Sequence, residues 1–172
     1  MNIDREELVR QAKRGKAEAF AALYEDIYMD LYRFAFYTLK QPQDAEDAVS
    51  ETVTTAFEKI RTLKKAEAFK SWMFQILVNQ CRKKLNRKSR DQELKLEKEP
   101  YSETDPSLPL SLREAFGQLS GQERMMIALS VFGGYRSNEI GEQMQLPAAT
   151  VRSKMSRAYG KLRKFLGEEE SK

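Results

Sequence analysis

Hydrophobic residues recur at intervals of three and four positions along most of this chain, the spacing that places them on one face of an α-helix. In the first half of the sequence this pattern predicts helices at about residues 5–14, 17–39, 45–60 and 67–88. The longest stripe belongs to the second helix and consists of Phe20, Leu23, Tyr24, Ile27, Leu31, Phe34 and Leu39. Because the connections are short, we expect the four helices to pack as one compact helical domain, residues 1–88.

Capping residues and helix breakers set the expected helix boundaries. Asp4 can cap the first helix, and Gly15 ends it. Pro42 is expected to close the second helix, and Asp44 is placed to cap the third. Residues 61–66 then form a basic loop, which we expect to be too short and too polar to contribute to the core.

A second helical domain follows an irregular segment. Residues 89–109 are rich in charge and carry three prolines, a composition typical of a flexible linker. Helical spacing returns over residues 110–167, where Ser120 and Glu123 have the spacing of a capping box. No strand pattern emerges. The sequence therefore predicts an all-α fold of two small helical domains joined by this linker, the second of which contains a helix-turn-helix.

The helix-turn-helix is expected at residues 137–157, where two short helical patterns flank a tight turn and small Gly141 stands where the helices must pass closely. The second pattern has an apolar stripe of Val151, Met155, Ala158, Leu162 and Phe165. Its other face carries Arg152, Lys154, Arg157, Lys161, Arg163 and Lys164. In a DNA-binding helix-turn-helix, the second helix enters the DNA major groove. The competing interpretation is a solvated helix whose C-terminal cations are favoured by the helix dipole. It explains Lys161, Arg163 and Lys164 but not Arg152, Lys154 and Arg157 near the N-terminal end.

The formal net charge is only +4, but the charge is segregated along the chain. Residues 41–58 hold five acids and no base, whereas residues 82–98 hold eight bases and three acids. A polyanion is the natural partner of the basic segment, and a basic partner suits the acidic one.

The chain has no His and one Cys, Cys81, of undetermined role, which excludes zinc sites, Cys-His nucleophiles and Ser-His triads. We expect no metal, no cofactor and no enzymatic activity. No signal segment or bilayer-length apolar run occurs, so we expect a cytoplasmic protein without membrane insertion.

Two surfaces of the first domain carry candidate chemistry. In the third predicted helix Asp47, Glu51 and Glu58 lie opposite the apolar stripe, which fits a solvated face and a docking face for a basic protein equally well. The fourth predicted helix begins with aromatic residues 69–72, ends with cations at residues 82–88, and has a polar stripe of Gln75, Asn79, Arg82 and Asn86. Cations near aromatics suit single-stranded nucleic acid, although we interpret Trp72 as a core residue.

These residues resemble a known family. Residues 44–52 and 69–79 resemble the second conserved region of bacterial RNA polymerase sigma factors. Residues 119–124, 139–141 and 150–158 resemble the fourth conserved region. A chain that has only these two regions around a short linker resembles the small extracytoplasmic-function group, whose members act in stress or envelope responses.

The resemblance implies a role for each surface. The acidic helix would dock on the coiled coil of the largest subunit of core RNA polymerase, through Asp44, Glu46, Asp47 and Glu51. The minus-ten promoter element would be read and melted by Arg61, Thr62, Leu63, Lys64, Lys65, Asn79, Arg82 and Lys83. The minus-thirty-five element would be read by Ala149, Thr150, Arg152, Ser153, Lys154 and Arg157. Further implied partners are the flap region of the second-largest subunit and a membrane-associated anti-sigma factor.

Three positions depart from the family pattern. Lys83 stands where many members carry an acid, Ser50 where Gln is common, and Gln145 where the turn usually has Gly. The main alternative is a stand-alone helix-turn-helix regulator whose first domain serves dimerisation or sensing. An RNA-binding or nuclease-like enzyme is disfavoured by the missing His and the scattered acids.

Overall fold

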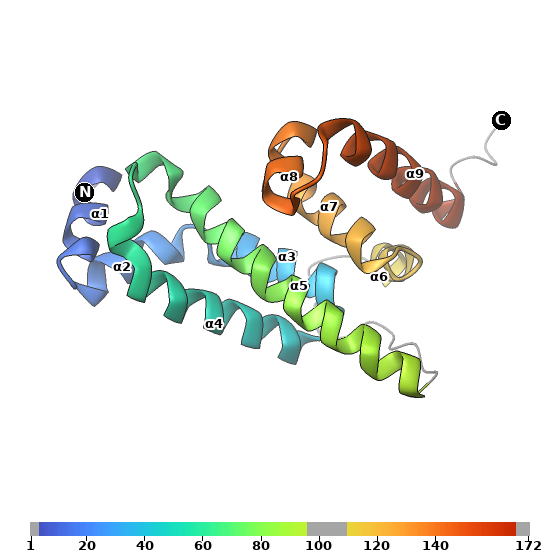
Figure 1. Cartoon of the computed structure of the whole chain (residues 1–172), viewed down its shortest axis with the longest axis horizontal. Coiled ribbons are helices and arrows are strands. Elements are labelled where there is room, and N and C mark those ends of the chain that lie inside the picture. The colour runs from blue at the N-terminus through green and yellow to red at the C-terminus, as the bar shows by residue number, and fades with distance from the viewer. Residues whose placement is uncertain (1–3, 96–109, 168–172) are drawn as a thin grey trace.

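A computed structural model of the protein describes residues 4–95 and 110–167, with side chains described for residues 4–90 and 110–167. The described residues form helices and no strands (Figure 1). The helices are α1 (Arg5–Lys13), α2 (Ala17–Glu25), α3 (Tyr28–Leu39), α4 (Pro42–Lys59), α5 (Phe69–Lys95), α6 (Leu110–Gly117), α7 (Gly121–Val131), α8 (Ser137–Met144) and α9 (Ala148–Leu166), with short 3₁₀ turns η1 (Ile60–Thr62) and η2 (Ala66–Ala68). The predicted all-α fold of two domains is confirmed.

The single helix expected over residues 17–39 is wrong, because the chain breaks between α2 and α3. Ile27 leaves the helical path at φ −118° and ψ −1°, while its side chain stays buried. The two halves pack on different partners: α2 lies against α1, whereas α3 lies against α4, α5 and α7. The apolar spacing runs through the break unchanged, so it gave no sign of a change of direction.

The boundary between α3 and α4 also differs from the prediction. Lys40, in the left-handed conformation at φ 76°, ends α3. Pro42 opens α4 instead of closing the preceding helix, since its fixed φ and missing N–H suit the first helical position. Asp44 is therefore not a cap but lies in the first turn of α4, where the helix dipole favours a carboxylate.

The loop between α4 and α5 contributes to the core, contrary to expectation. Leu63 is 3% exposed, because the chain extends between η1 and η2 and turns this side chain inward. At its other end α5 continues through residues 89–95, which the sequence assigned to the linker. The remaining linker positions, 96–109, lie outside the described residues.

The second domain forms the expected helix-turn-helix. The capping box is confirmed, since Glu123 N donates to Ser120 Oγ at 3.2 Å and Ser120 N donates to Glu123 Oε1 at 3.0 Å. Gln145 takes the left-handed conformation at φ 59° in the turn between α8 and α9. Gly141 makes a close approach, but to the turn: a Cβ there would lie 2.5 Å from Leu146 O.

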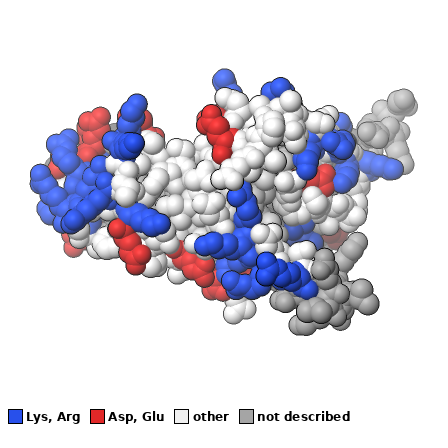
Figure 2. Space-filling view, viewed as in Figure 1, with Lys and Arg blue, Asp and Glu red and all other residues white. Residues whose placement is uncertain are grey.

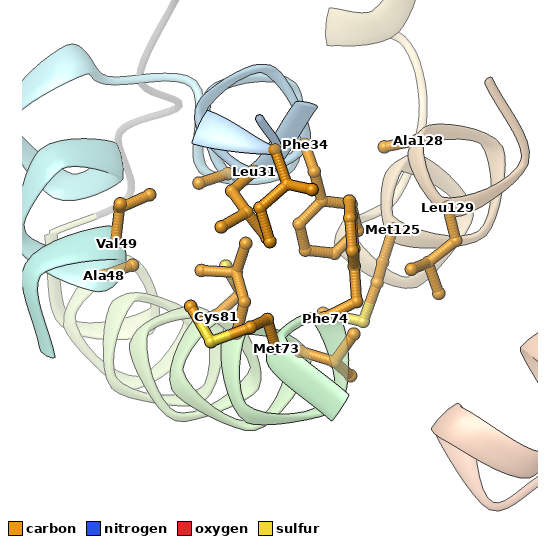
Figure 3. Packing of buried hydrophobic residues seen from close by; sticks show 14 of the residues in the cluster. Leu31, Phe34, Ala48, Val49, Met73, Phe74, Cys81, Met125, Ala128 and Leu129 are labelled. Carbon is orange, nitrogen blue, oxygen red and sulfur yellow. The ribbon is translucent and has the colours of Figure 1, made fainter. Parts of the chain in front are cut away.

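The hydrophobic core passes from one domain into the other. Figure 3 shows Phe34 of α3 and Phe74 of α5 close to Met125 of α7, and all three side chains are buried. Cys81 faces the same interior from α5, and burial raises the pKa of its thiol.

Candidate nucleic-acid and polymerase interfaces

The first part of α9 presents its polar residues to solvent. Val151 and Met155 are buried, whereas Arg152, Ser153 and Arg157 are exposed on the other side of the helix. Arg157 is oriented by Ser153, because its Nη2 donates to Ser153 Oγ at 3.2 Å. Arg152, Ser153 and Arg157 are three of the residues expected to read the minus-thirty-five element, and the structure brings them together on one exposed face. Ala149 is also exposed and Thr150 is half-buried on the first turn.

Two further cations of α9 bend towards α7. Lys154 Nζ donates to Gln122 Oε1 at 2.5 Å, and Lys161 Nζ lies 2.9 Å from Glu123 Oε1. Burial alone would raise the pKa of the Glu123 carboxyl, but hydrogen bonds from Lys161 and Ser120 hold it below its usual value. The sequence did not indicate these contacts with α7, because they join residues more than 30 positions apart.

The acidic face of α4 lies beside the cationic half of α5. Figure 2 shows acidic side chains along α4 and a gathering of Lys and Arg over the adjoining length of α5. Asp44 Oδ2 pairs with Lys88 Nζ at 2.5 Å, and Glu51 Oε1 lies 3.8 Å from Lys84 Nζ. Glu46 and Asp47 are exposed, like Glu51, whereas Asp44 is half-buried.

The expected minus-ten residues do not all meet in one place. Four of them line a groove of about 610 Å³ between the loop, α5 and α8. Its lining includes Thr62, Leu63, Lys64 and Lys65 of the loop, Ser71, Trp72 and Gln75 of α5, and Tyr135, Glu139, Glu142 and Gln143 of the second domain. Arg61 is exposed but donates through Nε to Lys13 O at 3.3 Å, at the end of α1. Leu63 belongs to the groove lining, but its side chain is only 3% exposed and offers a base little surface.

Asn79 is exposed on α5 but is not among the residues that line the groove. That Asn79 and the loop together hold one unstacked base stays a prediction. Gln75, one helical turn earlier on the same stripe, occupies the lining position. Arg82 lines a different cavity, of about 650 Å³, and Lys83 is exposed. Trp72 is half-buried, partly core and partly groove wall.

The fold and these surfaces define an all-helical protein of two domains, one of which carries a helix-turn-helix with an exposed cationic helix. Residues 23–91 match the family model "Sigma-70 region 2", and residues 110–162 match "Sigma-70, region 4". The chain is 30% identical over 154 residues to RNA polymerase sigma factor SigV of Bacillus subtilis, covering 84% of this chain and 89% of that one. It is 25% identical to ECF RNA polymerase sigma factor SigM of Mycobacterium tuberculosis, covering 94% and 84%.

Solved structures show the same fold. The sigma factor RpoE of Bartonella quintana, in complex with the anti-sigma factor NepR, superposes with a TM-score of 0.72 at 23% identity, covering 88% of this chain and 98% of that one. CnrH, in complex with the cytosolic domain of CnrY, superposes with a TM-score of 0.69 at 23% identity, covering 96% of this chain and 97% of that one. The chain belongs to the extracytoplasmic-function group of RNA polymerase sigma factors, and its function lies in transcription initiation.

Within the described part of the chain, no helix combines the length and the apolar composition that crossing a bilayer requires.

Proposed function

We propose that this sigma factor recruits core RNA polymerase through α4, reads the minus-thirty-five element through α9, and opens the minus-ten element with the groove beside α5. The observation that carries the proposal is the separation of charge: exposed acids gather on α4, and exposed cations gather on α5 and α9 (Figure 2). Such a chain supplies specificity, while polymerase supplies the catalysis.

Docking is assigned to the acidic face because two of its exposed carboxylates, Glu46 and Asp47, have no ion pair within the described residues. Asp44 and Glu51 pair with α5 instead. Both pairs are partly buried, since the Lys84 and Lys88 side chains are 13% and 24% exposed. A basic partner that takes over Asp44 or Glu51 must therefore also offset the loss of the lysine's own pairing.

Upstream DNA is held by α9. Arg152 and Arg157 project into solvent, and an Arg can bond a guanine edge with two donors. Lys154 and Lys161 lie against α7 and suit phosphates instead. The arginines therefore contribute sequence preference, and the lysines contribute affinity.

Melting is assigned to the groove between residues 62–65 and α5. Its cations Lys64 and Lys65 and its Trp72 wall suit one base taken out of the stack. Asn79, one turn beyond Gln75, is placed to bond the base or backbone of the adjacent nucleotide, since an amide both donates and accepts. Capture of unstacked bases then shifts the closed–open equilibrium of the promoter towards the melted form.

The test uses Asn79→Ala with Asn86→Ala, an exposed Asn two turns along the same helix, as the matched control. With core polymerase, Asn79→Ala should impair transcription strongly from duplex promoters and much less from promoters pre-melted by mismatches. Permanganate footprinting should show reduced strand opening with upstream contacts intact. Unchanged opening in Asn79→Ala would remove this residue from the minus-ten reader.

Regulation by an anti-sigma factor is proposed from the two solved relatives, one captured with an anti-sigma factor and one with a cytosolic domain of another protein. We propose a membrane-associated anti-sigma partner and a stress or envelope response. Pull-downs from unstressed cells should recover a second polypeptide besides polymerase. Recovery of polymerase alone, with constitutive target transcription, would indicate control by expression level.

A further inference from the structure

The cavity that Arg82 lines has a cationic wall. It lies where the second half of α5 passes α6 and the start of α7 (Figure 1), and its volume of about 650 Å³ is in the range of pockets that hold small ligands. Its described lining includes the cations Lys40, Arg82, Lys88 and Arg124, and no acid. A cavity with this charge favours an anion over a neutral or cationic ligand.

Arg82 has neither an ion pair nor a hydrogen bond among the described residues, although its side chain is half-buried. Removing part of a charged group from water costs free energy unless an opposite charge or hydrogen-bond acceptors replace that water. Lys88 differs from it, because Asp44 pairs with this lysine from outside the cavity lining. An anion in the cavity would give Arg82 the partner that the described part of the chain does not supply.

Arg124 of α7 is buried against the same cavity and is held there by two backbone carbonyl groups. Its Nε donates to Thr38 O at 3.0 Å, and its Nη1 donates to Leu119 O at 2.6 Å. Its Nη2 lies beside Gly121, since a Cβ added to that glycine would be 3.6 Å away. Gly121 belongs to the cavity lining, so the guanidinium brings a fixed positive charge to the wall. A group that is already fixed loses little freedom when a ligand binds.

The rest of the lining suits the organic part of a ligand. Leu85, Met125 and Met144 contribute apolar surface, and thioether sulfur atoms make favourable contacts with aromatic rings. Gln118 lines the cavity from the end of the segment after α6, and its carboxamide both donates and accepts hydrogen bonds, as the edge of a nucleobase does. Cations, apolar side chains and a carboxamide together match the phosphates, the ring and the ring edge of a nucleotide.

We propose that this cavity binds a free nucleoside diphosphate, with its phosphates against Arg82 and Arg124 and its base against the apolar wall. The proposal goes beyond the proposed function and does not rest on it. Arg82 is also among the residues expected at the minus-ten element, so a bound nucleotide and promoter DNA would compete for its side chain.

The first experiment is isothermal titration calorimetry of the full chain with GDP and with ADP. Guanosine and inorganic pyrophosphate serve as the two halves of GDP. At least one of the two nucleotides should bind at one site per chain, and guanosine and pyrophosphate should each bind at least about tenfold more weakly, since each half lacks one set of hydrogen bonds. Binding should also raise the Tm of the protein.

The matched variants are Arg82→Ala and Arg87→Ala. Both remove one positive charge from α5, but Arg87 is exposed and does not belong to the cavity lining. Arg82→Ala should weaken nucleotide binding at least about tenfold, because hydrogen bonds between charged groups are lost. Arg87→Ala should stay within about twofold, since salt screens an exposed charge outside the site. Unchanged circular dichroism spectra confirm that both variants fold.

The base is tested separately with Gln118→Ala. This change should weaken binding of the nucleotide at least about threefold, because a hydrogen bond to the base is lost. It should leave pyrophosphate affinity unchanged, which a general loss of structure would not do.

Four results would overturn the proposal. If neither nucleotide binds, the cavity is not a nucleotide site. If pyrophosphate binds as tightly as GDP, the cavity takes a simple anion. Equal losses in Arg82→Ala and Arg87→Ala would indicate diffuse attraction to the basic half of α5. If a single-stranded DNA oligonucleotide displaces GDP and binds more tightly in an Arg82-dependent manner, the occupant is nucleic acid rather than a free nucleotide.

Discussion

Gly141 supports a sharp test of the helix-turn-helix geometry. A methyl group at this position would lie 2.5 Å from Leu146 O and 3.5 Å from Ala148 N. The carbonyl cannot easily retreat, because the turn is tied to the same residue: Leu146 N donates to Gly141 O at 2.8 Å. Gly141→Ala must therefore push the start of α9 away from α8.

The magnitude follows from two opposing effects. Alanine is about 1 kcal/mol better than glycine inside a helix, which would stabilise α8 if there were room. Forcing an extra carbon into a packed site costs typically about 1–3 kcal/mol, and here the obstacle is backbone rather than a flexible side chain. We expect a net destabilisation of about 1–2 kcal/mol, or roughly 2–8 °C in Tm for a chain of this size.

Gly160→Ala is the matched control, because it makes the same change in α9 with no atom within 4 Å of the added carbon. It should stabilise the protein by up to about 1 kcal/mol, the opposite sign. Urea unfolding followed by circular dichroism measures both, and binding to upstream promoter duplex reports the displacement of α9. A Gly141→Ala protein as stable as Gly160→Ala, with wild-type duplex affinity, would refute the close approach.

Three further outcomes are expected. Asp47→Lys with Glu51→Lys should weaken polymerase co-purification, by on the order of 2 kcal/mol or more, while helicity is unchanged; undiminished association would end the docking role. Arg152→Ala and Arg157→Ala should each cost roughly 1–3 kcal/mol in binding to promoter duplex. An equal loss on all sequences, with a smaller salt slope, would restrict both arginines to phosphates. Cys81, which is buried and whose pKa is raised by burial, should react with a thiol reagent only as fast as the protein unfolds; rapid labelling of the native chain would contradict its burial.

Helix identity was well predicted because it depends on local spacing, which the sequence displays directly. The capping box at Ser120 was foreseen for the same reason, since it involves neighbours along the chain. The exposed face of α9 was predicted correctly because the apolar stripe on the opposite side of the helix showed which side would be buried. Of the candidate site, the sequence therefore predicted the residues that lie on one face of one helix.

The errors lie where distant residues decide the outcome. Leu63 looked like a surface residue of a basic loop, yet the loop is anchored by this side chain in the core. Asp44 was expected to cap a helix and Glu51 to lie on a solvated or docking face, although α5 supplies Lys88 and Lys84 to them. None of these contacts can be recognised from the spacing of hydrophobic and polar residues along the sequence.

The contact between the domains did leave a trace in the sequence that helical spacing alone overlooked. All six residues from Phe34 to Leu39 are buried, so the last turns of α3 are covered on every side. A helix that is apolar all round requires a partner on each face, whereas an ordinary surface helix requires one. α4 and α5 cover only part of α3, and α7 of the second domain packs against it as well. The run from Phe34 to Leu39 therefore indicates a second partner for α3. In this structure that partner is α7, and Tyr37 packs between Phe116 and Phe132 of the second domain.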